Sequence, residues 1–527
     1  MTSGGNDRRL PPGLTAAAFG RALQAFRAAV GAQWVLVADE DRAAYVDPFA
    51  LDDGSSHSPS AIVAPAGVEE VQAVVRIANE HGVPLWPISR GKNLGYGGPA
   101  PRMAGTVTVD LTRMNRILEV DEKYGYCLVE PGVGFFDLHD HLQKNRIPLW
   151  MSVPGNAWGS VAGNALERGV GPQPYGDHAA QICGLEVVLP TGSLVRTGTG
   201  AMAGSRTWQT ARHGYGPGWD PMFCQSNFGI VTKLGLWLMP APEATMSLMV
   251  SFPEAGDLRR GIDTLYPLRR NGVVDHDIAF VSYVGLASYA SPRSRWFEGE
   301  GVLPEPVGVQ IRKDLGLGWW TSFINLYGYE KVIKANAEIV LDTLRGHAPE
   351  PLAFATWRTG DPPERSGAGI PGTRDMQMIN WRGGRGGHLG FSPLLPADGA
   401  LAQDQFERAR CRYEAHGLDY YGAFAVGRRA IVNVNEILYD RDDRAMTSAV
   451  DTLFGELVAD AARHGYGEYR THLDYMDEVA ATFDFNDYAL LRLNETVKDA
   501  LDPNGVLAPG KQGIWPRRYR DQRKGVR

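Results

Sequence analysis

A tyrosine and an arginine stand side by side late in the chain, at Tyr469 and Arg470 in the stretch HGYGEYRTH. Neighbouring residues of a strand point to opposite faces, whereas in a loop or at a strand end they can converge. A phenol hydroxyl and a guanidinium that converge can hold a carboxylate, a phosphate or a phenolate. Without convergence the two residues are an ordinary exposed pair, so the residues alone leave both interpretations open.

A histidine surrounded by glycines is the second candidate, His388 in GGRGGHLGFSP (383–393). Glycine lets the backbone come very close to a flat or bulky group. One interpretation is a flexible loop that happens to contain a histidine. The other is that His388 lies against a large planar cofactor.

Two further stretches contain many small residues. PISRGKNLGYGG (87–98) follows a predicted strand, and its backbone N–H groups could form an anion-binding nest, with Lys92 and Asn93 as extra donors. WGSVAGNALERGVG (158–171) would permit close approach of the backbone to a ligand. Both stretches have a structural alternative, a plain turn in the first case and tight packing of elements in the second.

Motifs for several other chemistries do not occur. The chain contains no GxxxxGK[ST], GxSxG or HExxH sequence. Its one GxGxxG match, GAGIPG at 367–372, follows a polar stretch with prolines rather than a strand, so we interpret it as chance. His139 and His141 would face different ways on a helix, and the four cysteines form no CxxC pair, so we expect no metal.

Composition narrows the class of protein. The 527 residues are 44% hydrophobic and 21% charged, which allows two or three domains with a large core. A net charge of −7 lacks the basic footprint of a nucleic-acid binder. No apolar run is long enough to span a membrane, and the N-terminus lacks the apolar segment of a secretory signal. We expect a cytoplasmic protein with neither nucleic-acid nor membrane partners.

Hydrophobic spacing indicates two α+β regions. A strand at 61–64, a helix at 68–79 and a strand at 83–89 predict a βαβ unit. Short strands follow at 106–111, 126–130, 185–190, 194–197 and 230–239, with a helix at 135–144 among them. After Pro240–Pro242, strands alternate with longer helices at 330–345, 400–416 and 446–464. A last helix, 487–501, precedes the turn-rich DPNGVLAPGKQGIWP, which resembles neither a tail nor a third domain.

Taken in order, eight motifs resemble the vanillyl-alcohol oxidase family, which includes eugenol oxidase and p-cresol methylhydroxylase. They are PxSxGKNxGYGG, EPGVxxxDL, WGSVxGNxLxRGVG, PYGDH, QSNxGIVTK, NWxxxxGGHLGFSP, GYGEYRTH and LDPNGVLAPGKxGIW, and they extend over about residues 10 to 520. The resemblance implies a two-domain α+β flavoprotein. Its FAD-binding domain would comprise 1–245 and 466–527, and a cap domain, 246–465, would cover the active site.

The resemblance also implies FAD, with the 89–96 loop at its pyrophosphate, and a covalent bond from His388 to the flavin. The glycines around His388 would then make room for the flavin ring, and the bond would make the flavin a stronger oxidant. The other residues that we expect to bind the cofactor are Ser89, Arg90, Gly91, Lys92, Asn93, Leu94, Gly95, Pro154, Gly155, Trp158, Gly159, Ser160, Gly163, Asn164, Gly229, Ile230, Val231 and Lys511.

A phenol site is implied at Tyr96, Tyr469 and Arg470. Binding a phenol as phenolate near pH 7 requires a pKa shift of about three units, or about 4 kcal/mol. One nearby cation supplies about one to three units, and two tyrosine hydroxyls would help with the remainder. We expect Ser392 and Ala425 to line the substrate pocket.

Two departures from the family pattern bear on the reaction. Family oxidases usually carry an aspartate at the position of Ser152, close to the flavin, where it assists base chemistry and flavin attachment. A serine resembles the methylhydroxylase branch, and it is no general base at neutral pH without activation. The stretch GRRAIVNV (427–434) also departs from the oxidases, which indicates a remodelled pocket wall.

The leading hypothesis is an oxidase of para-substituted phenols: 4-hydroxybenzylic alcohols, 4-alkylphenols and 4-allylphenols. A hydride would leave the benzylic carbon for the flavin, giving a p-quinone methide, and O2 would be reduced to H2O2. The alternative is a dehydrogenase or hydroxylase that passes electrons to a cytochrome or another carrier, which Ser152 favours. A third hypothesis is a flavin-binding scaffold without turnover. A homodimer or larger homo-oligomer is also implied by the resemblance.

Overall fold

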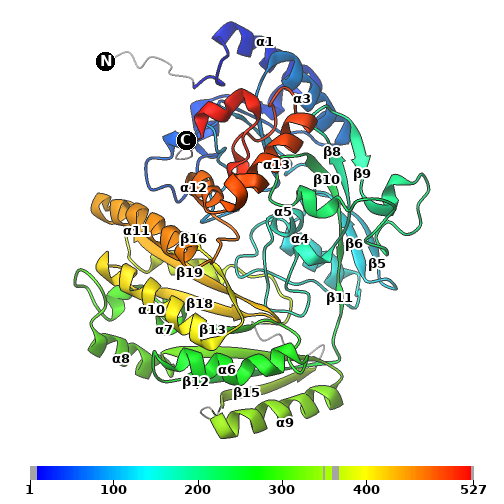
Figure 1. The fold of residues 1–527 in the computed structure, drawn as a ribbon. Helices are drawn as coiled ribbons and strands as arrows, with labels where there is room; N and C mark the ends of the chain where they lie inside the picture. Colours follow the sequence, from blue (N-terminus) through cyan, green and yellow to red (C-terminus); the bar gives the residue numbers. More distant parts are fainter. Residues whose placement is uncertain (1–8, 348–350, 359–366, 524–527) are drawn as a thin grey trace.

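The chain folds into two mixed α/β parts (Figure 1). The structure is a computed structural model that describes residues 9–347, 351–358 and 367–523. The first part carries a four-stranded and a five-stranded sheet. The second part is built on an eight-stranded sheet, which we call the cap sheet. The two-domain α+β fold predicted from the sequence is confirmed. No helix of the described ranges is long and apolar enough to cross a membrane.

The four-stranded sheet contains the predicted βαβ unit. Its order is β1-β2-β4-β3, and β2 and β3 both run parallel to β4 between them. Helix α3 buries its apolar stripe, Val71, Val74, Val75 and Ala78, and it ends where Gly82 adopts a φ of 66°. The elements are β1 (Val35–Leu36), β2 (Ala61–Val63), α3 (Val68–His81), β3 (Leu85–Ile88) and β4 (Val107–Asp110), with α1 (Ala16–Val30) packed against α3.

The five-stranded sheet is antiparallel, in the order β5-β6-β10-β8-β9. A tight turn connects β8 to β9, where Gly192 donates its N–H to the Leu189 carbonyl at 2.8 Å. The strands are β5 (Ile117–Asp121), β6 (Tyr126–Val129), β8 (Ile182–Val188), β9 (Leu194–Arg196) and β10 (Ile230–Trp237). Helices α4 (Phe135–Lys144) and α5 (Val161–Leu166) and the small sheet of β7 (Leu149–Trp150) and β11 (Met239–Pro240) complete this region.

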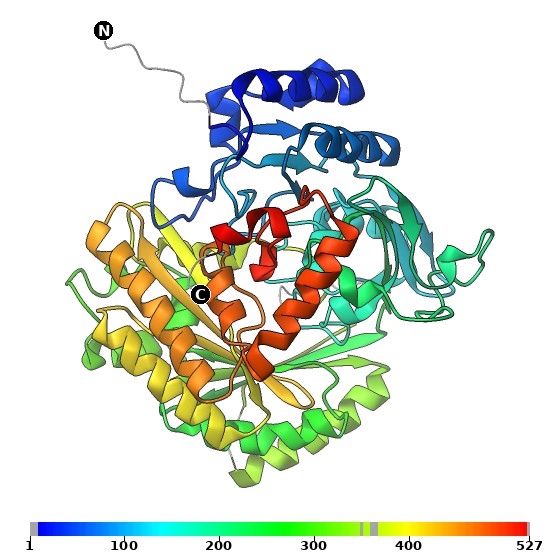
Figure 2. The same cartoon turned by 45° about the horizontal axis from the view of Figure 1, so that its top comes forward.

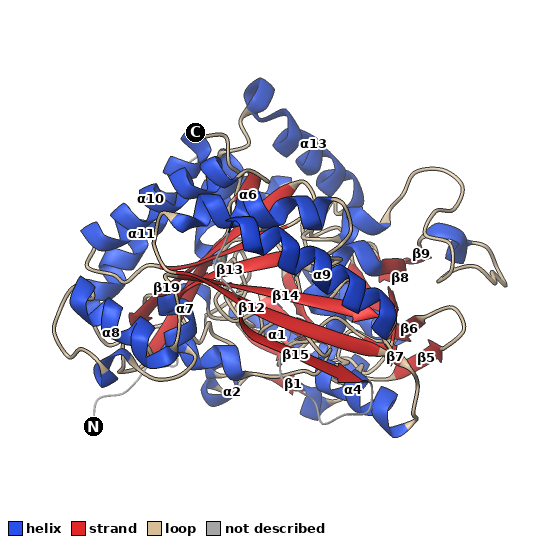
Figure 3. Cartoon of the chain, turned by 90° about the horizontal axis from the view of Figure 1, so that it is seen from below, coloured by secondary structure: helices blue, strands red, loops and turns tan. Residues whose placement is uncertain are grey.

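The cap sheet has the order β15-β12-β14-β13-β18-β19-β16, and β17 pairs with β19. Its strands are β12 (Ala244–Phe252), β13 (Ile278–Ser282), β14 (Trp320–Gly328), β15 (Pro351–Arg358), β16 (Gly386–Phe391), β17 (Leu394–Pro396), β18 (Tyr421–Val426) and β19 (Ala430–Asp440). Helices α9 (Glu330–His347), α6 (Asp257–Arg270), α10 (Gly399–Ala415) and α11 (Arg444–Arg463) follow one another along the sheet (Figure 3). Of two shorter helices, α7 (Tyr283–Ser288) contacts β13 and β18, and α8 (Glu305–Leu315) packs against α7.

The C-terminal segment returns to the first part of the fold. After α12 (Met476–Ala481) and α13 (Phe485–Leu501), the chain runs beside β3, where Leu85 exchanges backbone hydrogen bonds of 2.7 Å with Val506 and Ala508. In Figure 2 this red segment lies against the blue N-terminal elements and the cyan second sheet. The described part of this segment after α13 therefore packs on the first part of the fold, which explains why it did not resemble a separate domain.

Candidate active site

A cavity of about 460 Å³ lies where the two sheets of the first part, the cap sheet and the C-terminal segment meet. Most of the site residues predicted from the sequence line it, from six separate stretches of the chain. They are Ser89, Gly91, Lys92, Asn93, Leu94, Tyr96, Pro154, Gly155, Gly159, Ser160, Gly163, Asn164, Gly229, Ile230, Val231, His388, Ser392, Tyr469, Arg470 and Lys511.

One face of the cap sheet forms the far wall of this cavity. Tyr421 and Ala423 of β18 pair with Glu436 and Val434 of β19, and all four side chains line the cavity. Residues directly opposite each other on neighbouring strands share a face, and the face alternates along each strand. The β-strand register therefore points these side chains inward, while the next residue of β18, Phe424, is fully buried in the core of the cap.

His388 reaches the cavity from β16. Its Nδ1 lies 2.8 Å from Oε2 of Glu436, and its Nε2 is buried without a hydrogen-bond partner in the described chain. The ring packs so closely on Gly95 that a Cβ there would lie 2.4 Å from His388 Cε1. The ring of Phe49 meets it edge-on at 5.1 Å. One ring nitrogen is thus held by a carboxylate, and the other is left available to a ligand.

Two of the glycines around His388 pack closely against protein atoms. A Cβ on Gly386 would lie 1.8 Å from the Ile379 carbonyl oxygen, and one on Gly390 would lie 2.7 Å from the Tyr96 hydroxyl. Gly390 therefore lets β16 approach the loop that carries Tyr96, and Gly386 lets it approach the turn that carries Ile379.

Tyr96, Tyr469 and Arg470 come together at the cavity. The Arg470 guanidinium lies over the Tyr96 ring and donates a hydrogen bond to the Asn93 side chain. Its Nε is buried without a partner in the described chain. Gln225 holds the backbone next to the pair by donating to the Tyr469 carbonyl at 2.9 Å. Residues 469 and 470 lie in a bend rather than a strand, and both line the cavity.

Burial and charge set the protonation states of this cluster. Burial raises the pKa of Tyr96 and of Tyr469, and the positive charge of Arg470 lowers each pKa in part. Burial also raises the pKa of Glu468 well above its usual range, although backbone N–H groups of Ser392 and Arg470 offset part of that shift. Both tyrosines are therefore neutral hydrogen-bond donors beside a cation.

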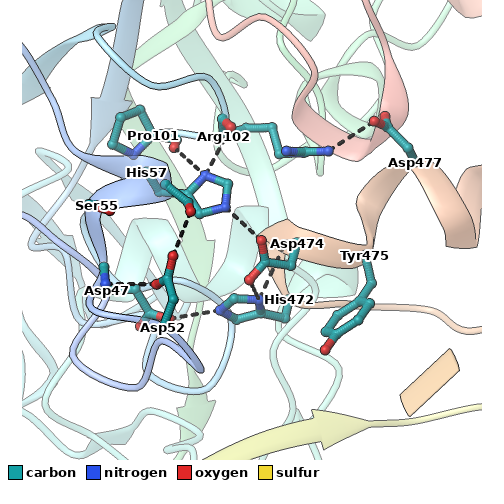
Figure 4. A network of polar contacts seen from close by, with 12 residues as sticks. Asp47, Asp52, Ser55, His57, Pro101, Arg102, His472, Asp474, Tyr475 and Asp477 are labelled. Atoms are coloured by element: carbon teal, nitrogen blue, oxygen red, sulfur yellow. Dashed lines mark hydrogen bonds and ion pairs between the residues drawn. The ribbon is translucent and has the colours of Figure 1, made fainter. Parts of the chain in front are cut away.

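A buried chain of acid and imidazole groups fixes the segment that follows Arg470 (Figure 4). His472 Nε2 lies 2.8 Å from Oδ2 of Asp47, and its Nδ1 lies 3.4 Å from Oδ2 of Asp474. Asp474 in turn lies 2.6 Å from Nε2 of His57. Burial alone would lower the pKa of His472, but its two aspartate partners raise it to about 9. This network connects Asp47 and His57 to the loop that carries Tyr469 and Arg470.

Ser152 lies behind the cavity wall. Its hydroxyl donates to Oε1 of Gln173 at 2.8 Å, and Nε2 of His178 lies 2.9 Å from the Ser152 Oγ. Burial lowers the pKa of His178 to about 3, so its imidazole is neutral. Ser152 is not among the residues that line the cavity, although Pro154 and Gly155 of the same stretch are.

Four other predicted residues also lie outside the cavity lining. Arg90 forms an ion pair of 2.7 Å with Asp137, and Gly95 supports the His388 ring. Trp158 is half exposed under Lys92, whose Nζ lies 4.6 Å from the ring centroid. Ala425 shares the inward face of β18 but stands two residues beyond Ala423, past the cavity.

Among the polar cavity residues that sequence reasoning did not name are four on the cap: Tyr289, Asp375, Tyr421 and Glu436. Tyr289 and Tyr421 bond to each other through their hydroxyls. Of these four residues, only Glu436 could have been noticed in the sequence, because it is an acid in the otherwise apolar and amide-rich strand AIVNVNEIL. The other three lie in segments whose face is set by tertiary packing.

Comparison with known proteins gives the same class of protein. A family model described as "FAD binding domain" matches residues 59–198, and one described as "FAD linked oxidases, C-terminal domain" matches 376–512. The chain is 37% identical over 515 residues to the flavoprotein subunit of 4-cresol dehydrogenase (hydroxylating) from Pseudomonas putida, covering 97% of this chain and 98% of that protein. It is 31% identical to 1'-carboxy-chondrochloren decarboxylase from Chondromyces crocatus, covering 94% and 98%.

Solved structures show the same similarity over nearly the whole chain. A 4-ethylphenol oxidase from Gulosibacter chungangensis, in an isoeugenol complex, superposes with a TM-score of 0.92 at 36% identity, covering 97% of this chain and 99% of that one. A substrate-bound p-cresol methylhydroxylase also gives 0.92, at 37% identity, covering 96% and 99%.

Fold, cavity and family models define an FAD-dependent oxidoreductase. The chain belongs to the vanillyl-alcohol oxidase and p-cresol methylhydroxylase family of FAD-linked phenol-oxidising flavoproteins. The family and enzyme class predicted from the motifs are confirmed. The residues present fit FAD, because the cavity offers an unpartnered buried imidazole nitrogen on one wall and the polar 89–93 loop on another.

Proposed function

We propose that the chain oxidises para-substituted phenols at the benzylic carbon, with 4-alkylphenols as the central substrate class and 4-allylphenols and 4-hydroxybenzylic alcohols beside them. The observation that carries the proposal is the meeting of Arg470, Tyr96 and Tyr469 at one cavity. Relatives named for 4-cresol and 4-ethylphenol, similar over nearly the full chain, support the same class.

The three side chains hold the substrate oxygen as phenolate. Arg470 supplies the positive charge, and the two tyrosines, kept neutral by burial, donate hydrogen bonds. Together they lower the phenol pKa by the required three units or so, about 4 kcal/mol. A phenolate pushes electron density through the ring toward the para carbon, which eases hydride loss there and leaves a p-quinone methide. Bound FAD supplies the hydride acceptor.

The chain would hold FAD through the predicted residues that line the cavity, and His388 would form the covalent bond. Support for the bond comes from the two nitrogens of His388. Glu436 engages Nδ1, so the lone pair of Nε2 is directed away from Glu436 and is free to bond. An acid-precipitated sample whose pellet stays yellow would demonstrate the bond.

For the second half of the cycle we propose O2 as electron acceptor, with H2O2 as product. The alternative is a dehydrogenase that passes electrons to a cytochrome or another carrier. It is supported by Ser152, which places no carboxylate in the position usual for oxidases, and by the dehydrogenase relative. Turnover measured with O2 and with an artificial dye separates them: stoichiometric peroxide supports the oxidase, and fast dye reduction with little peroxide supports the dehydrogenase.

The deciding experiment is anaerobic reduction of the purified yellow holoenzyme by 4-ethylphenol. The matched control is the methyl ether of 4-ethylphenol, which has the same shape near the ring but no proton to lose. We expect bleaching with the phenol and none with the ether. Equal bleaching by both compounds, or by neither, would refute the proposal. Light scattering of the same sample tests the homodimer that the resemblance implies.

A further inference from the structure

Two tyrosines of the cap meet at the cavity, Tyr289 at the C-terminal end of α7 and Tyr421 at the start of β18. We call them the tyrosine pair. Their hydroxyls hydrogen-bond to each other, and their rings meet edge-on with centroids 6.2 Å apart. Burial raises the pKa of both, so both hydroxyls are neutral. Neither residue belongs to the phenol cluster of Tyr96, Tyr469 and Arg470.

The strand register of the cap sheet places the pair relative to the phenol cluster. Tyr421 of β18 pairs with Glu436 of β19, which pairs on its other side with Gly390 of β16. The Tyr96 hydroxyl lies over Gly390, where a Cβ would be 2.7 Å away. Neighbouring strands are about 4.8 Å apart, so the strand of Tyr421 lies about 10 Å across the sheet from the strand beneath Tyr96. The two tyrosines therefore stand at opposite ends of one row, with Glu436 between them.

The charges around these residues agree with that order. Burial is the largest cause of the raised pKa of all four tyrosines. Arg470 lowers the pKa of the two phenol-cluster tyrosines in part, whereas Asp375 raises the pKa of both members of the tyrosine pair. Glu436, in the middle of the row, raises the pKa of all four. A phenol whose oxygen lies at Arg470 would therefore extend its para substituent past Glu436 toward the tyrosine pair.

The packing behind Tyr421 leaves no room to lengthen the cavity there. The Tyr421 ring rests on α7, where a Cβ on Gly285 would lie 3.2 Å from its Cε2. The Ser282 hydroxyl accepts hydrogen bonds from the N–H groups of Gly285, at 3.4 Å, and Gly422, at 3.2 Å. This hydroxyl thus joins the start of α7 to the residue that follows Tyr421. Tyr289, in contrast, is partly exposed, so space freed at its ring would open toward solvent.

We propose that Tyr289 limits the length of the para substituent: its ring, held by the hydroxyl bond to Tyr421, closes the end of the cavity opposite Arg470. This inference rests on the proposed function and deepens it, because it restricts the substrates to phenols with short para substituents such as methyl, ethyl and allyl. A longer chain meets the Tyr289 ring and holds the benzylic carbon out of position. Tyr289 acts here as a specificity-determining residue and takes no part in the electron transfer.

The test is anaerobic reduction of the holoenzyme by 4-ethylphenol and by 4-pentylphenol, with the ratio of their second-order rate constants as readout. A ratio measured on one sample does not depend on how much of a variant folds or binds flavin. In wild type 4-ethylphenol should be favoured at least about hundredfold, since one methylene in an apolar pocket already discriminates by about 10- to 200-fold. In Tyr289→Ala that ratio should fall at least about tenfold.

Two further variants separate the ring from the hydroxyl. Tyr289→Phe keeps the ring and loses the bond to Tyr421, so its ratio should fall by less than that of Tyr289→Ala. Tyr289→Trp enlarges the ring, so reduction by 4-ethylphenol should slow relative to 4-methylphenol, a shift in the opposite direction. The matched control is Tyr329→Ala, which removes a tyrosine that is 72% exposed and should keep the wild-type ratio.

Two outcomes would overturn the inference. One is a wild type that 4-pentylphenol reduces as fast as 4-ethylphenol does. The other is a Tyr289→Ala variant with the wild-type ratio. Failure of 4-ethylphenol to bleach wild type would instead refute the proposed function.

Discussion

The guanidinium carbon of Arg470 lies 4.1 Å from the centroid of the Tyr96 ring, so a cation covers the face of a phenol side chain that lies at the substrate cavity. The two residues are far apart in the chain, and the hydrogen bond from Arg470 to Asn93 fixes the same loop a second time. A planar guanidinium can stack on a ring and bond in its own plane at once, which an ammonium cannot do.

Arg470→Lys is therefore expected to lose most phenol oxidation. We expect flavin reduction by 4-ethylphenol to fall at least about hundredfold, on the order of 2.7 kcal/mol. Stopped-flow reduction measures this loss directly. The matched control is Arg295→Lys, because Arg295 also lies over a ring, that of Trp296 at 5.3 Å, but outside the cavity lining. Near-normal reduction by Arg470→Lys would remove this residue from the phenolate site.

His388→Ala is expected to abolish covalent attachment of the flavin while FAD still binds. Acid precipitation should then release all the flavin into the supernatant, whereas wild type and the surface control His139→Ala should keep it in the pellet. Glu436→Gln should attach the flavin more slowly, because it weakens the acceptor that holds His388 Nδ1 at 2.8 Å. Flavin that is already released from wild type would show that no bond forms.

Stability is expected to fall at alkaline pH because of His472. The pKa of His472 is raised to about 9 from an unfolded value near 6.5. The folded protein therefore binds this proton more tightly than the unfolded chain does. The stabilisation is fully present below about pH 6.5 and is lost as the pH rises through about 9. In His472→Gln we expect stability at pH 7 to fall by roughly 3 kcal/mol, since a buried partner of Asp47 is removed.

Thermal unfolding measured from pH 6 to 10 checks this prediction. The decline of the melting temperature between pH 7 and 9.5 should be steeper in wild type than in His472→Gln. The control His464→Gln changes a histidine at the C-terminal end of α11 that is 40% exposed. Identical pH dependence in wild type and His472→Gln would contradict the raised pKa.

Ser152→Ala is expected to leave flavin reduction within about threefold of wild type and to cost about 1 kcal/mol of stability, the usual contribution of one hydrogen bond. The reason is that Ser152 bonds to Gln173 and His178 behind the cavity wall. Ser152→Asp would instead bury a carboxylate beside His178 and should raise the pKa of that imidazole from about 3. A large loss of activity in Ser152→Ala would place the hydroxyl in the reaction.

Local sequence patterns were sufficient to predict much of the secondary structure in the first part of the fold. The stripe of Val71, Val74, Val75 and Ala78 with Gly82 after it predicted α3 to within two residues, and 135–144 matched α4. These elements are set by periodicity and end signals carried within a few residues. The cap was predicted only as alternating strands and helices, because its strand order depends on pairing between segments far apart in sequence.

The motifs likewise determined the family and FAD and predicted Tyr96, His388, Tyr469 and Arg470 as site residues, since residue types and their order are contained in the chain itself. Only the tertiary structure decided that Ser152 faces away from the cavity and that Asp375 faces into it. The direction of a side chain in a loop depends on what packs against it, and for both residues those neighbours come from distant segments. The physical reason is that chemistry is local to a residue, whereas its orientation is fixed by contacts that exist only once the chain has folded.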